Sequence, residues 1–324
     1  MAQCITKMEY MINWLKLQFT WKHIGEIIVK GLAVFGGIQA FFEFSDYFFK
    51  NLAISGDINK LKDCFSNHIL LFAIILIVVL FILLQRKSNF SWKVNGTNLT
   101  VEIALCDFFK QEGLKVIHVT DTFDTDYTIP NLIDPKTLHG QFLNMFYSKR
   151  KEIDRQIIEE LKSCKQDKNA KLPAKKCIYS IGTVAMINMA DNHYALTVYS
   201  RMQPDKRAIM PQSKEEYNDF LVNMWINLAK KATTDETVNV VVFGEGLNRM
   251  PASFTKQKKI NEIIRSFIVC SLEGVSYKKL RICLKCNKRE NLEEFEKLQY
   301  LQYEFDSMNV QTGGKPVGNV INPT

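Results

Sequence analysis

The segment from Ile69 to Leu84 constrains the architecture of this chain most, because it contains no charged, amide or hydroxyl side chain. A helix rises about 1.5 Å per residue, so the segment nearly crosses a hydrocarbon core of about 30 Å. Phe65 or local thinning of the bilayer makes up the difference. A buried core helix is the alternative, but such helices usually hold about 10–14 apolar residues, and the cations Arg86 and Lys87 follow closely. The segment therefore predicts a membrane span.

A second apolar segment, from Ile24 to Phe49, is interrupted by polar side chains. Charges inside a span usually pair or serve a function, and small residues let helices approach closely. An amphipathic helix in the membrane interface is the alternative. Together the two segments predict a transmembrane hairpin of two helices within residues 1–90. The residues that we expect to act inside the membrane are Lys30, Gly36, Gly37, Gln39 and Glu43.

The charges that flank the two segments predict their orientation. Lys7, Lys16 and Lys22 precede the hairpin, and Arg86 and Lys87 follow it. Because cytoplasmic flanks carry an excess of Lys and Arg, both ends of the hairpin and the rest of the chain are predicted to be cytoplasmic. Three matches to the N-glycosylation pattern shortly after the hairpin favour the opposite orientation, but the positive flanks argue against it.

Composition excludes several classes of function. The formal net charge is +8, but the basic residues are scattered and no aromatic stacking motif accompanies them, so nucleic acid is not an expected partner. Eight cysteines at irregular spacing are typical of reduced thiols. Cys283 and Cys286 have the spacing of zinc ligands but lack the second pair that a structural zinc site needs, so we expect no metal and no cofactor.

From residue 91 onward short strands alternate with amphipathic helices, which predicts an α/β domain over 91–289, with a mixed sheet and helices on both faces. A further helix is predicted over 290–310 and a disordered tail over 311–324. The predicted strands are Phe90–Val94, Leu99–Leu105, Lys115–Val119, Lys176–Ile187, Tyr194–Ser200, Val238–Phe243 and Lys279–Leu284, the first two joined by a two-residue Asn95-Gly96 turn. The predicted helices are Thr137–Cys164, Ser213–Lys231 (with a capping box of Ser213 and Glu216) and Thr255–Leu272.

The strand Val238–Phe243 breaks abruptly into Gly244, Glu245 and Gly246. Val and Phe without alternation are typical of a parallel strand that is buried on both faces. Glycines let the backbone turn sharply and present its N–H groups to an anion, and helical periodicity begins again at Thr255. The pattern favours a phosphate-binding loop, with a purely structural turn as the alternative.

Six motifs, taken in chain order, resemble the macro domain of Thoeris anti-phage systems. With the hairpin in front, the chain is similar to the transmembrane–macro effectors of type II Thoeris systems. The resemblance covers Leu99 to Leu284 by motif and residues 1–90 by architecture alone. The motifs are Leu105-Cys-Asp107-Phe-Phe, Val116-Ile-His-Val, Thr122-Phe-Asp124-Thr, Thr137-Leu-His139-Gly140-Gln141-Phe142, Tyr179-Ser-Ile-Gly182-Thr183-Val-Ala185 and Phe243-Gly-Glu-Gly-Leu-Asn-Arg249.

The resemblance implies a sensor in the inner membrane of a bacterium, with the macro domain in the cytoplasm. In such a system a partner TIR-domain protein makes an ADP-ribose derivative, histidine-ADP-ribose in this type, and the macro domain binds it. The membrane part then oligomerises and disrupts the lipid bilayer of the infected cell, which is abortive infection.

The resemblance also implies which residues bind the ligand. Asp107 falls where macro domains place the aspartate that accepts a hydrogen bond from the adenine amino group. Leu138, His139, Gly140 and Gln141 fall on the first phosphate loop. The other expected residues are Gly182 and Thr183 and, on or after the second phosphate loop, Gly244, Glu245, Gly246, Leu247, Asn248 and Arg249.

The second loop departs from the family pattern. Family members commonly have a small residue in place of Glu245 and a glycine in place of Asn248. A carboxylate beside a diphosphate is unfavourable, so Glu245 is expected to point away from the ligand, with a different binding mode as the alternative. Arg249 pairs with phosphate through a charge-assisted hydrogen bond, or it is an ordinary surface arginine.

Four further residues carry two interpretations each. His139 donates to a phosphate or a ribose, or it is a satisfied structural histidine. Asp121 and Asp124 hold ribose hydroxyls or a cationic part of the ligand, or they form a solvated acidic turn. Phe123 stacks on a base, or it belongs to the core.

The sequence contains no Gly-x-Ser-x-Gly and no His-Glu-x-x-His pattern. We therefore expect a binding protein and not an enzyme. Two alternatives stay open. One is a membrane-anchored macro domain that hydrolyses ADP-ribosyl esters, and the other is a membrane scaffold that binds protein alone.

Overall fold

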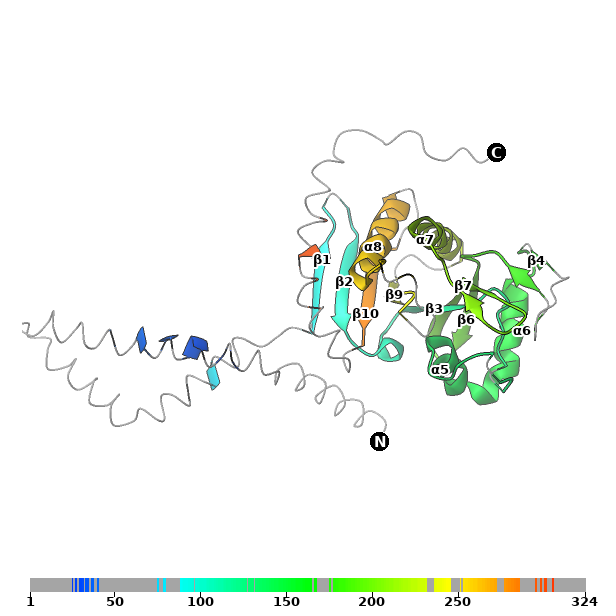
Figure 1. Cartoon of the computed structure of the whole chain (residues 1–324), viewed down its shortest axis with the longest axis horizontal. Coiled ribbons are helices and arrows are strands. Elements are labelled where there is room, and N and C mark those ends of the chain that lie inside the picture. The colour runs from blue at the N-terminus through cyan, green and yellow to red at the C-terminus, as the bar shows by residue number, and fades with distance from the viewer. Residues whose placement is uncertain are drawn as a thin grey trace, which may run out of the picture. The chain divides into compact units, whose positions relative to one another are not determined.

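The computed structural model separates into two compact units, Met1–Ser88 and Asn89–Thr324 (Figure 1). The residues that it describes are most of 88–285, apart from 96, 127, 131, 165, 168–174, 176, 232–235, 246–250, 252 and 273–276, with scattered positions within 25–40, 75–79 and 295–305.

In the first unit, all described residues before Ser88 are helical. Among them no helix is long and apolar enough to cross a membrane. Most of Ile24–Phe49 and of Ile69–Leu84 lies outside the described residues, so the transmembrane hairpin stays a prediction. Of the residues expected to act in the membrane, the helical ones are Lys30, Gly36 and Gly37, and those outside the described part are Gln39 and Glu43.

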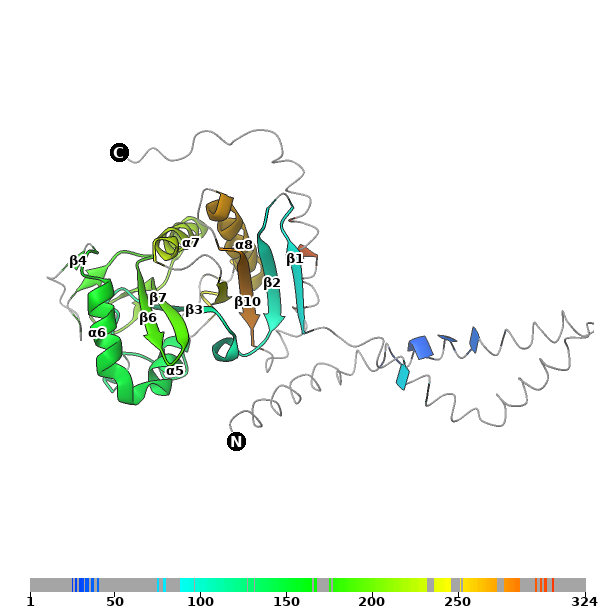
Figure 2. The same cartoon turned by 180° about the vertical axis from the view of Figure 1, so that it is seen from behind.

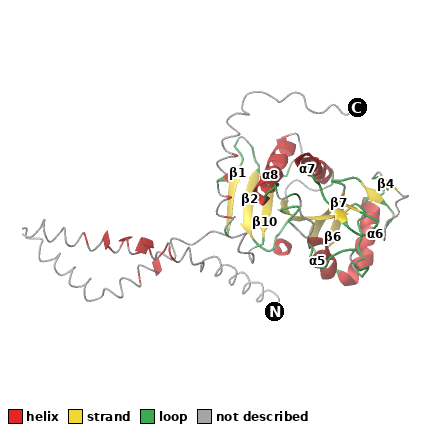
Figure 3. Ribbon diagram, viewed as in Figure 1, coloured by secondary structure: helices red, strands yellow, loops and turns green. Residues whose placement is uncertain are grey.

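The second unit is built on an eight-stranded mixed sheet with the order β1-β2-β10-β9-β3-β7-β6, in which β8 pairs with β7 (Figure 3). The strands β2, β10, β9, β3 and β7 are parallel to one another, and β1 and β6 are antiparallel at the two ends. A small sheet pairs β4 with β5. The strands are β1 (Asn89–Lys93), β2 (Thr100–Leu105), β3 (Leu114–Thr120), β4 (Gln166–Asp167), β5 (Ile178–Tyr179), β6 (Val184–Met189), β7 (Asn192–Met202), β8 (Ala208–Ile209), β9 (Thr237–Val241) and β10 (Lys279–Leu284).

Helices cover both faces of this sheet, as predicted (Figures 1 and 2). On β7, Tyr194 lies against Phe142 of α5 with ring centroids 4.9 Å apart, and Tyr199 lies against Phe220 of α7 at 4.7 Å. Because side chains of one strand are buried on both sides, the central part of β7, from Tyr194 to Tyr199, is apolar apart from Thr197. The helices are α5 (Leu138–Met145), α6 (Arg150–Glu160), α7 (Lys214–Ala229) and α8 (Lys256–Leu272), with the 3-10 helices η1 (Phe108–Lys110) and η2 (Tyr147–Lys149).

The predicted hairpin of β1 and β2 forms, but its turn is longer than expected. Val94 N donates to Leu99 O at 2.9 Å, so the loop spans residues 95–98, and the prediction of a two-residue turn is wrong. Thr97 explains the longer loop, because its backbone N–H (3.1 Å) and its hydroxyl (2.8 Å) both donate to Val94 O.

Two long predicted elements are broken. Gly182, with a φ of 82°, divides the predicted strand Lys176–Ile187 into β5 and β6. Phe146, with a φ of −114°, ends α5 inside the predicted helix Thr137–Cys164, and η2 and α6 follow. The helical period of the sequence continues across the break, which is why the pattern predicted one helix. The other predicted strands and the helices Ser213–Lys231 and Thr255–Leu272 are confirmed with small shifts at their ends. Ser213 Oγ caps α7 by accepting from Glu216 N at 3.1 Å.

The segment predicted as a C-terminal helix contributes aromatic contacts to β1. Its described helical residues are Phe295, Leu298, Leu301 and Phe305, and all are buried. The ring centroid of Phe295 lies 5.2 Å from that of Phe90, and Phe305 stacks on Trp92 at 6.5 Å. These contacts cover an edge strand that would otherwise expose apolar side chains. The predicted tail, residues 311–324, lies outside the described residues.

Candidate functional site at the carboxyl edge of the sheet

Parallel pairing brings several predicted ligand-binding residues to one edge of the sheet. Because β2, β9 and β3 run in the same direction, their carboxyl ends meet there, where ligands of open α/β sheets collect. Asp107 follows β2, Asp121 follows β3, and Gly244 lies shortly after β9. Gly182 and Thr183 precede β6, which is antiparallel to β7, so they face the same edge.

Asp107 is exposed at the end of β2, where it caps η1. Its Oδ1 accepts from Phe109 N at 3.1 Å, and its Oδ2 lies 3.8 Å from Lys110 Nζ. The side chain is 51% exposed. A carboxylate has about four acceptor positions, so Asp107 keeps capacity for another donor such as an amino group.

The amino terminus of α5 offers free backbone amides. Thr137 caps the helix, because its hydroxyl accepts from Gly140 N at 3.0 Å and its carbonyl accepts from Gln141 N at 2.9 Å. The N–H groups of Leu138 and His139 form no hydrogen bond with any described residue. Two free N–H groups at the positive end of a helix dipole form a place where an anion binds.

Gly140 is required by packing inside the domain. A Cβ at this position would lie 2.2 Å from Asp134 O and 2.7 Å from the Cα of Pro135. The missing side chain therefore lets α5 begin directly against this turn. A contact between Gly140 and phosphate stays a prediction.

The described part of the second loop turns toward α8. Gly244 has a φ of 77°, and its carbonyl accepts from Lys259 Nζ at 3.0 Å. The same ammonium pairs with Glu245 Oε1 at 2.6 Å, and the Lys259 side chain is only 5% exposed. This internal partner fits the expectation that Glu245 points away from a ligand. The remaining predicted residues of this loop, Gly246, Leu247, Asn248 and Arg249, lie outside the described residues.

Asp121 and Asp124 are buried, so the interpretation of a solvated acidic turn is wrong. Asp121 Oδ1 accepts from Met202 N at 2.8 Å. Asp124 accepts from the Thr122 hydroxyl at 2.6 Å and from Lys175 N at 3.0 Å. Burial raises the pKa of both carboxyls above the usual range. Each carboxylate connects the segment after β3 to a distant segment, at Met202 or at Lys175. A contact between either carboxylate and a ligand stays a prediction.

Phe123 and Gly182 also have partners within the domain. Phe123 is 1% exposed and has a φ of 48°, and its ring lies edge-on to Tyr179 at 5.4 Å. A Cβ on Gly182 would lie 2.4 Å from the Cβ of Asn223 in α7. Thr183 donates its N–H to Ser180 O at 3.0 Å, and its side chain is buried.

His118 of β3 was not among the predicted site residues, although it is the one imidazole in the Val-Ile-His-Val strand. Its Nδ1 and the Nε2 of His139 are buried and have no partner among the described residues. Burial lowers the pKa of His118 to about 4. Burial, with smaller contributions from His118 and Lys175, lowers the pKa of His139 to about 3. Both rings are therefore neutral at pH 7, so each offers a neutral hydrogen-bonding group and not a positive charge.

Lys259 and Lys175 are further side chains that sequence reasoning missed at this edge. Lys175 Nζ donates to Phe123 O at 2.7 Å and pairs with Asp154 at 2.6 Å. Each lysine lies far along the chain from the loop it holds, so no local pattern marks it.

Among the described residues, no group of three or more His, Cys, Asp and Glu side chains has the arrangement of a metal site.

The strand order and the two helical layers define an α/β domain of the macro type, with its candidate site at the carboxyl edge. Residues 101–285 match the family model described as Thoeris protein ThsA, Macro domain. The match spans more than half of the chain, so the chain belongs to this family.

Solved structures of similar fold include two point mutants of the macrodomain of Oceanobacillus iheyensis and the same macrodomain with ADP. Each is 14% identical to this chain. The matches cover 67%, 68% and 67% of this chain and 100%, 96% and 97% of those chains, with TM-scores of 0.44, 0.46 and 0.39. At this identity the likeness concerns the fold alone. No curated protein matches the chain.

Proposed function

We propose that the macro domain senses an ADP-ribose-derived nucleotide at the carboxyl edge of its sheet. One observation carries this proposal: parallel pairing sets an exposed carboxylate with spare acceptor positions, Asp107, at the same edge as the turn at Gly244. The free amides at the start of α5 provide a phosphate site. Family membership supports the choice of an ADP-ribose derivative over other nucleotides.

Calorimetry of the full chain with ADP-ribose tests the proposal. If Asp107 accepts from the adenine amino group, Asp107→Ala weakens binding by about 1.5–3 kcal/mol. Asp219→Ala is the matched control, because Asp219 is an exposed aspartate on α7. Equal losses in both variants, or no loss in the first, would remove Asp107 from the site.

The terminal group of the ligand is part of the proposal. We infer that a partner TIR-domain protein makes the signal and that its terminal group is histidine, which rests on the resemblance to type II Thoeris systems. Titration of histidine-ADP-ribose beside ADP-ribose and ADP tests this choice. Equal affinity for the three compounds would mean that the domain does not read the terminal group.

We further propose that ligand binding drives oligomerisation and that residues 1–90 then disrupt the inner membrane. A ligand shifts a conformation only if it binds one state better than another, so it must favour the state in which hairpins meet. The small faces at Gly36 and Gly37 support close helix contact. Replacing both with leucine should block ligand-dependent leakage of liposomes and preserve ligand affinity. Leakage that persists in this variant contradicts the role of these glycines.

We propose binding without turnover. Incubation of the full chain with an ADP-ribosyl ester should leave the ester intact over the time in which binding is complete. Hydrolysis that is lost in Asp107→Ala and kept in Asp219→Ala would instead make the domain an esterase.

A further inference from the structure

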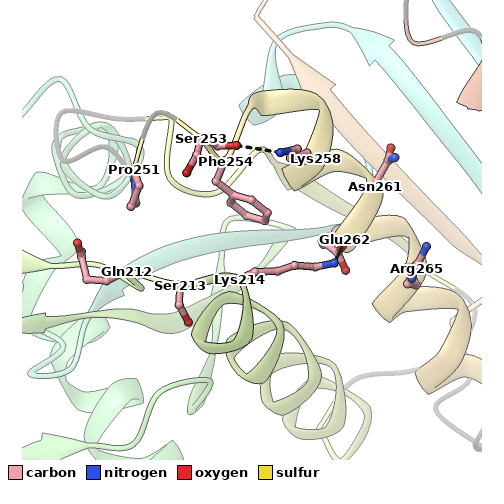
Figure 4. A pocket seen from close by; sticks show the side chains of 10 residues that line it. All are labelled: Gln212, Ser213, Lys214, Pro251, Ser253, Phe254, Lys258, Asn261, Glu262 and Arg265. Carbon is pink, nitrogen blue, oxygen red and sulfur yellow. Dashed lines mark hydrogen bonds and ion pairs between the residues drawn. The ribbon is translucent and has the colours of Figure 1, made fainter.

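A cavity of about 430 Å³ lies between the amino-terminal ends of α7 and α8 (Figure 4). Cavities of about 300–1,000 Å³ are typical of small-molecule sites. None of the described residues that were predicted to bind the nucleotide lines it. The lining residues that matter for its chemistry are Lys214, Phe254, Lys258, Asn261, Glu262 and Arg265.

The charge of the lining is unbalanced. Lys214 Nζ pairs with Glu262 Oε1 at 2.8 Å, so these two charges neutralise each other. Lys258 Nζ donates to Ser253 O at 3.0 Å, and neither it nor Arg265 forms an ion pair with any described acid. Among the described residues, therefore, two cations of this concave site have no counter-charge, which favours an anionic ligand.

The start of α8 adds to this positive potential. Its first turn has no acidic residue and contains Lys256, Lys258 and Lys259. Cations at a helix amino terminus are unfavourable with respect to the helix dipole, and anions there are favourable. Glu245 pairs with Lys259. An anion beside Lys258 would relieve the repulsion that the sequence places at this helix end.

The same cavity offers a flat apolar surface and a polar atom without a partner. Figure 4 shows the Phe254 ring between the two helices, pointing into the cavity. Tyr217 supports it from α7, with ring centroids 5.2 Å apart. Asn261 Oδ1 is buried and has no partner among the described residues, so it would accept from a ligand N–H or O–H.

We propose that this cavity is a second ligand site, which binds a small aromatic anion. The ring lies against Phe254, the anionic group meets Lys258 and Arg265, and Asn261 takes a polar hydrogen of the ligand. The two cations are seven residues apart on one helix, about 10 Å along its axis and on the same face, and both line the cavity. The shared chemistry is that of an aryl phosphate or an aromatic carboxylate.

Calorimetry of the full chain, saturated with ADP-ribose, tests this site with four simple probes. Phenyl phosphate and benzoate carry both a ring and an anionic group. Inorganic phosphate lacks the ring, and benzyl alcohol lacks the charge. We expect the first two to bind at least about tenfold more tightly than the last two, which corresponds to 1.4 kcal/mol. The better of the first two identifies the anionic group.

Three variants connect this binding to the cavity. Arg265→Gln and Lys258→Gln remove the unpaired charges, and we expect each to weaken the better probe by about fivefold or more. Lys230→Gln is the matched control, because Lys230 is an exposed lysine at the other end of α7. Thermal denaturation checks that each variant is folded.

Equal affinity of Arg265→Gln, Lys258→Gln and the unchanged protein would overturn the proposal, as would equal binding of the probes without a ring. Phe254→Leu serves as a second test of the ring contact and should reduce the preference for aromatic probes. Binding of ADP-ribose and binding of phenyl phosphate are measured independently. If the chain binds no ADP-ribose but Arg265→Gln still weakens phenyl phosphate, the proposed function fails and this second site stands.

Discussion

Asp107 and Asp124 follow two parallel strands of one sheet, yet they differ in what they have left to offer a ligand. Asp124 is 1% exposed and accepts from the Thr122 hydroxyl and the Lys175 N–H. The side chain of Asp107 is 51% exposed and accepts one short hydrogen bond, from Phe109 N. A carboxylate at the carboxyl edge is therefore not a ligand-binding group by its position alone. It must also have hydrogen-bonding capacity that the protein itself does not use.

Asp124→Ala should have the largest effect on stability. It leaves the buried Thr122 hydroxyl and the partly buried Lys175 N–H without this acceptor, and unsatisfied partners of a charged group cost about 2–4 kcal/mol. Urea unfolding of the full chain, followed by intrinsic fluorescence, measures the loss. Asp107→Ala, measured in parallel, should change the free energy of unfolding by about 1 kcal/mol or less, the usual cost of a lost cap. Similar losses in both would remove the contrast between the two aspartates.

Gly140→Ala should have the next largest effect. The added Cβ would meet backbone atoms of Asp134 and Pro135, which do not move away easily. Overpacking of this kind costs about 1–3 kcal/mol. Gly36→Ala is the matched control, because a Cβ at Gly36 has no neighbour within 4 Å. If Gly140→Ala loses ligand affinity and keeps full stability, Gly140 belongs with Asp107 as a ligand contact.

His118 differs from Asp124 in the opposite way, because its Nδ1 is buried but has no partner among the described residues. Phe fits the edge-on contacts that the ring makes with Tyr199 and Phe243. His118→Phe should therefore stabilise the domain by about 1 kcal/mol at pH 7, because a buried unsatisfied group is removed.

The pH dependence of this variant has a definite sign. The pKa of His118 is about 4 in the folded protein, and in the unfolded chain it has the ordinary value of 6.5. The unfolded chain therefore takes up the proton first as the pH falls. Stability that depends on the neutral ring is complete above pH 6.5 and is lost toward pH 4. The advantage of His118→Phe should grow across this interval, by at most about 1.4 kcal/mol per pH unit. A constant difference in urea unfolding would show that His118 is protonated in the folded state as well.

Most of the sheet was predictable from sequence because its strands are buried on both faces. The runs that became β3, β9 and β10 are short and apolar, and glycine or polar clusters bound them. The break at Phe146 and the turn at Gly182 were missed, since tertiary packing decides both. Gly182 is pressed against Asn223, which lies on a helix about forty residues further along the chain.

The candidate site was predictable only where local sequence places the residues. Asp107 and the start of α5 follow from motifs, and the structure finds them at the expected ends of elements. Lys259 and Lys175 hold their loops from a distance, so no local spacing announces them. The burial of Asp121 and Asp124 was missed for the same reason, because the groups that cover and bond them come from Met202 and Lys175.

The smallest predicted change is Asp107→Asn, which separates the charge of this side chain from its geometry. Asn is as good a cap as Asp and keeps one acceptor oxygen, so the free energy of unfolding should stay within about 0.5 kcal/mol of the unchanged protein. A neutral acceptor forms a weaker hydrogen bond than a carboxylate, so affinity for ADP-ribose should fall by about 0.5–1.5 kcal/mol, less than in Asp107→Ala. Calorimetry and urea unfolding of the two variants side by side measure both quantities. If Asp107→Asn loses as much affinity as Asp107→Ala, the charge itself recognises the ligand, and if neither loses any, Asp107 is only the cap of η1.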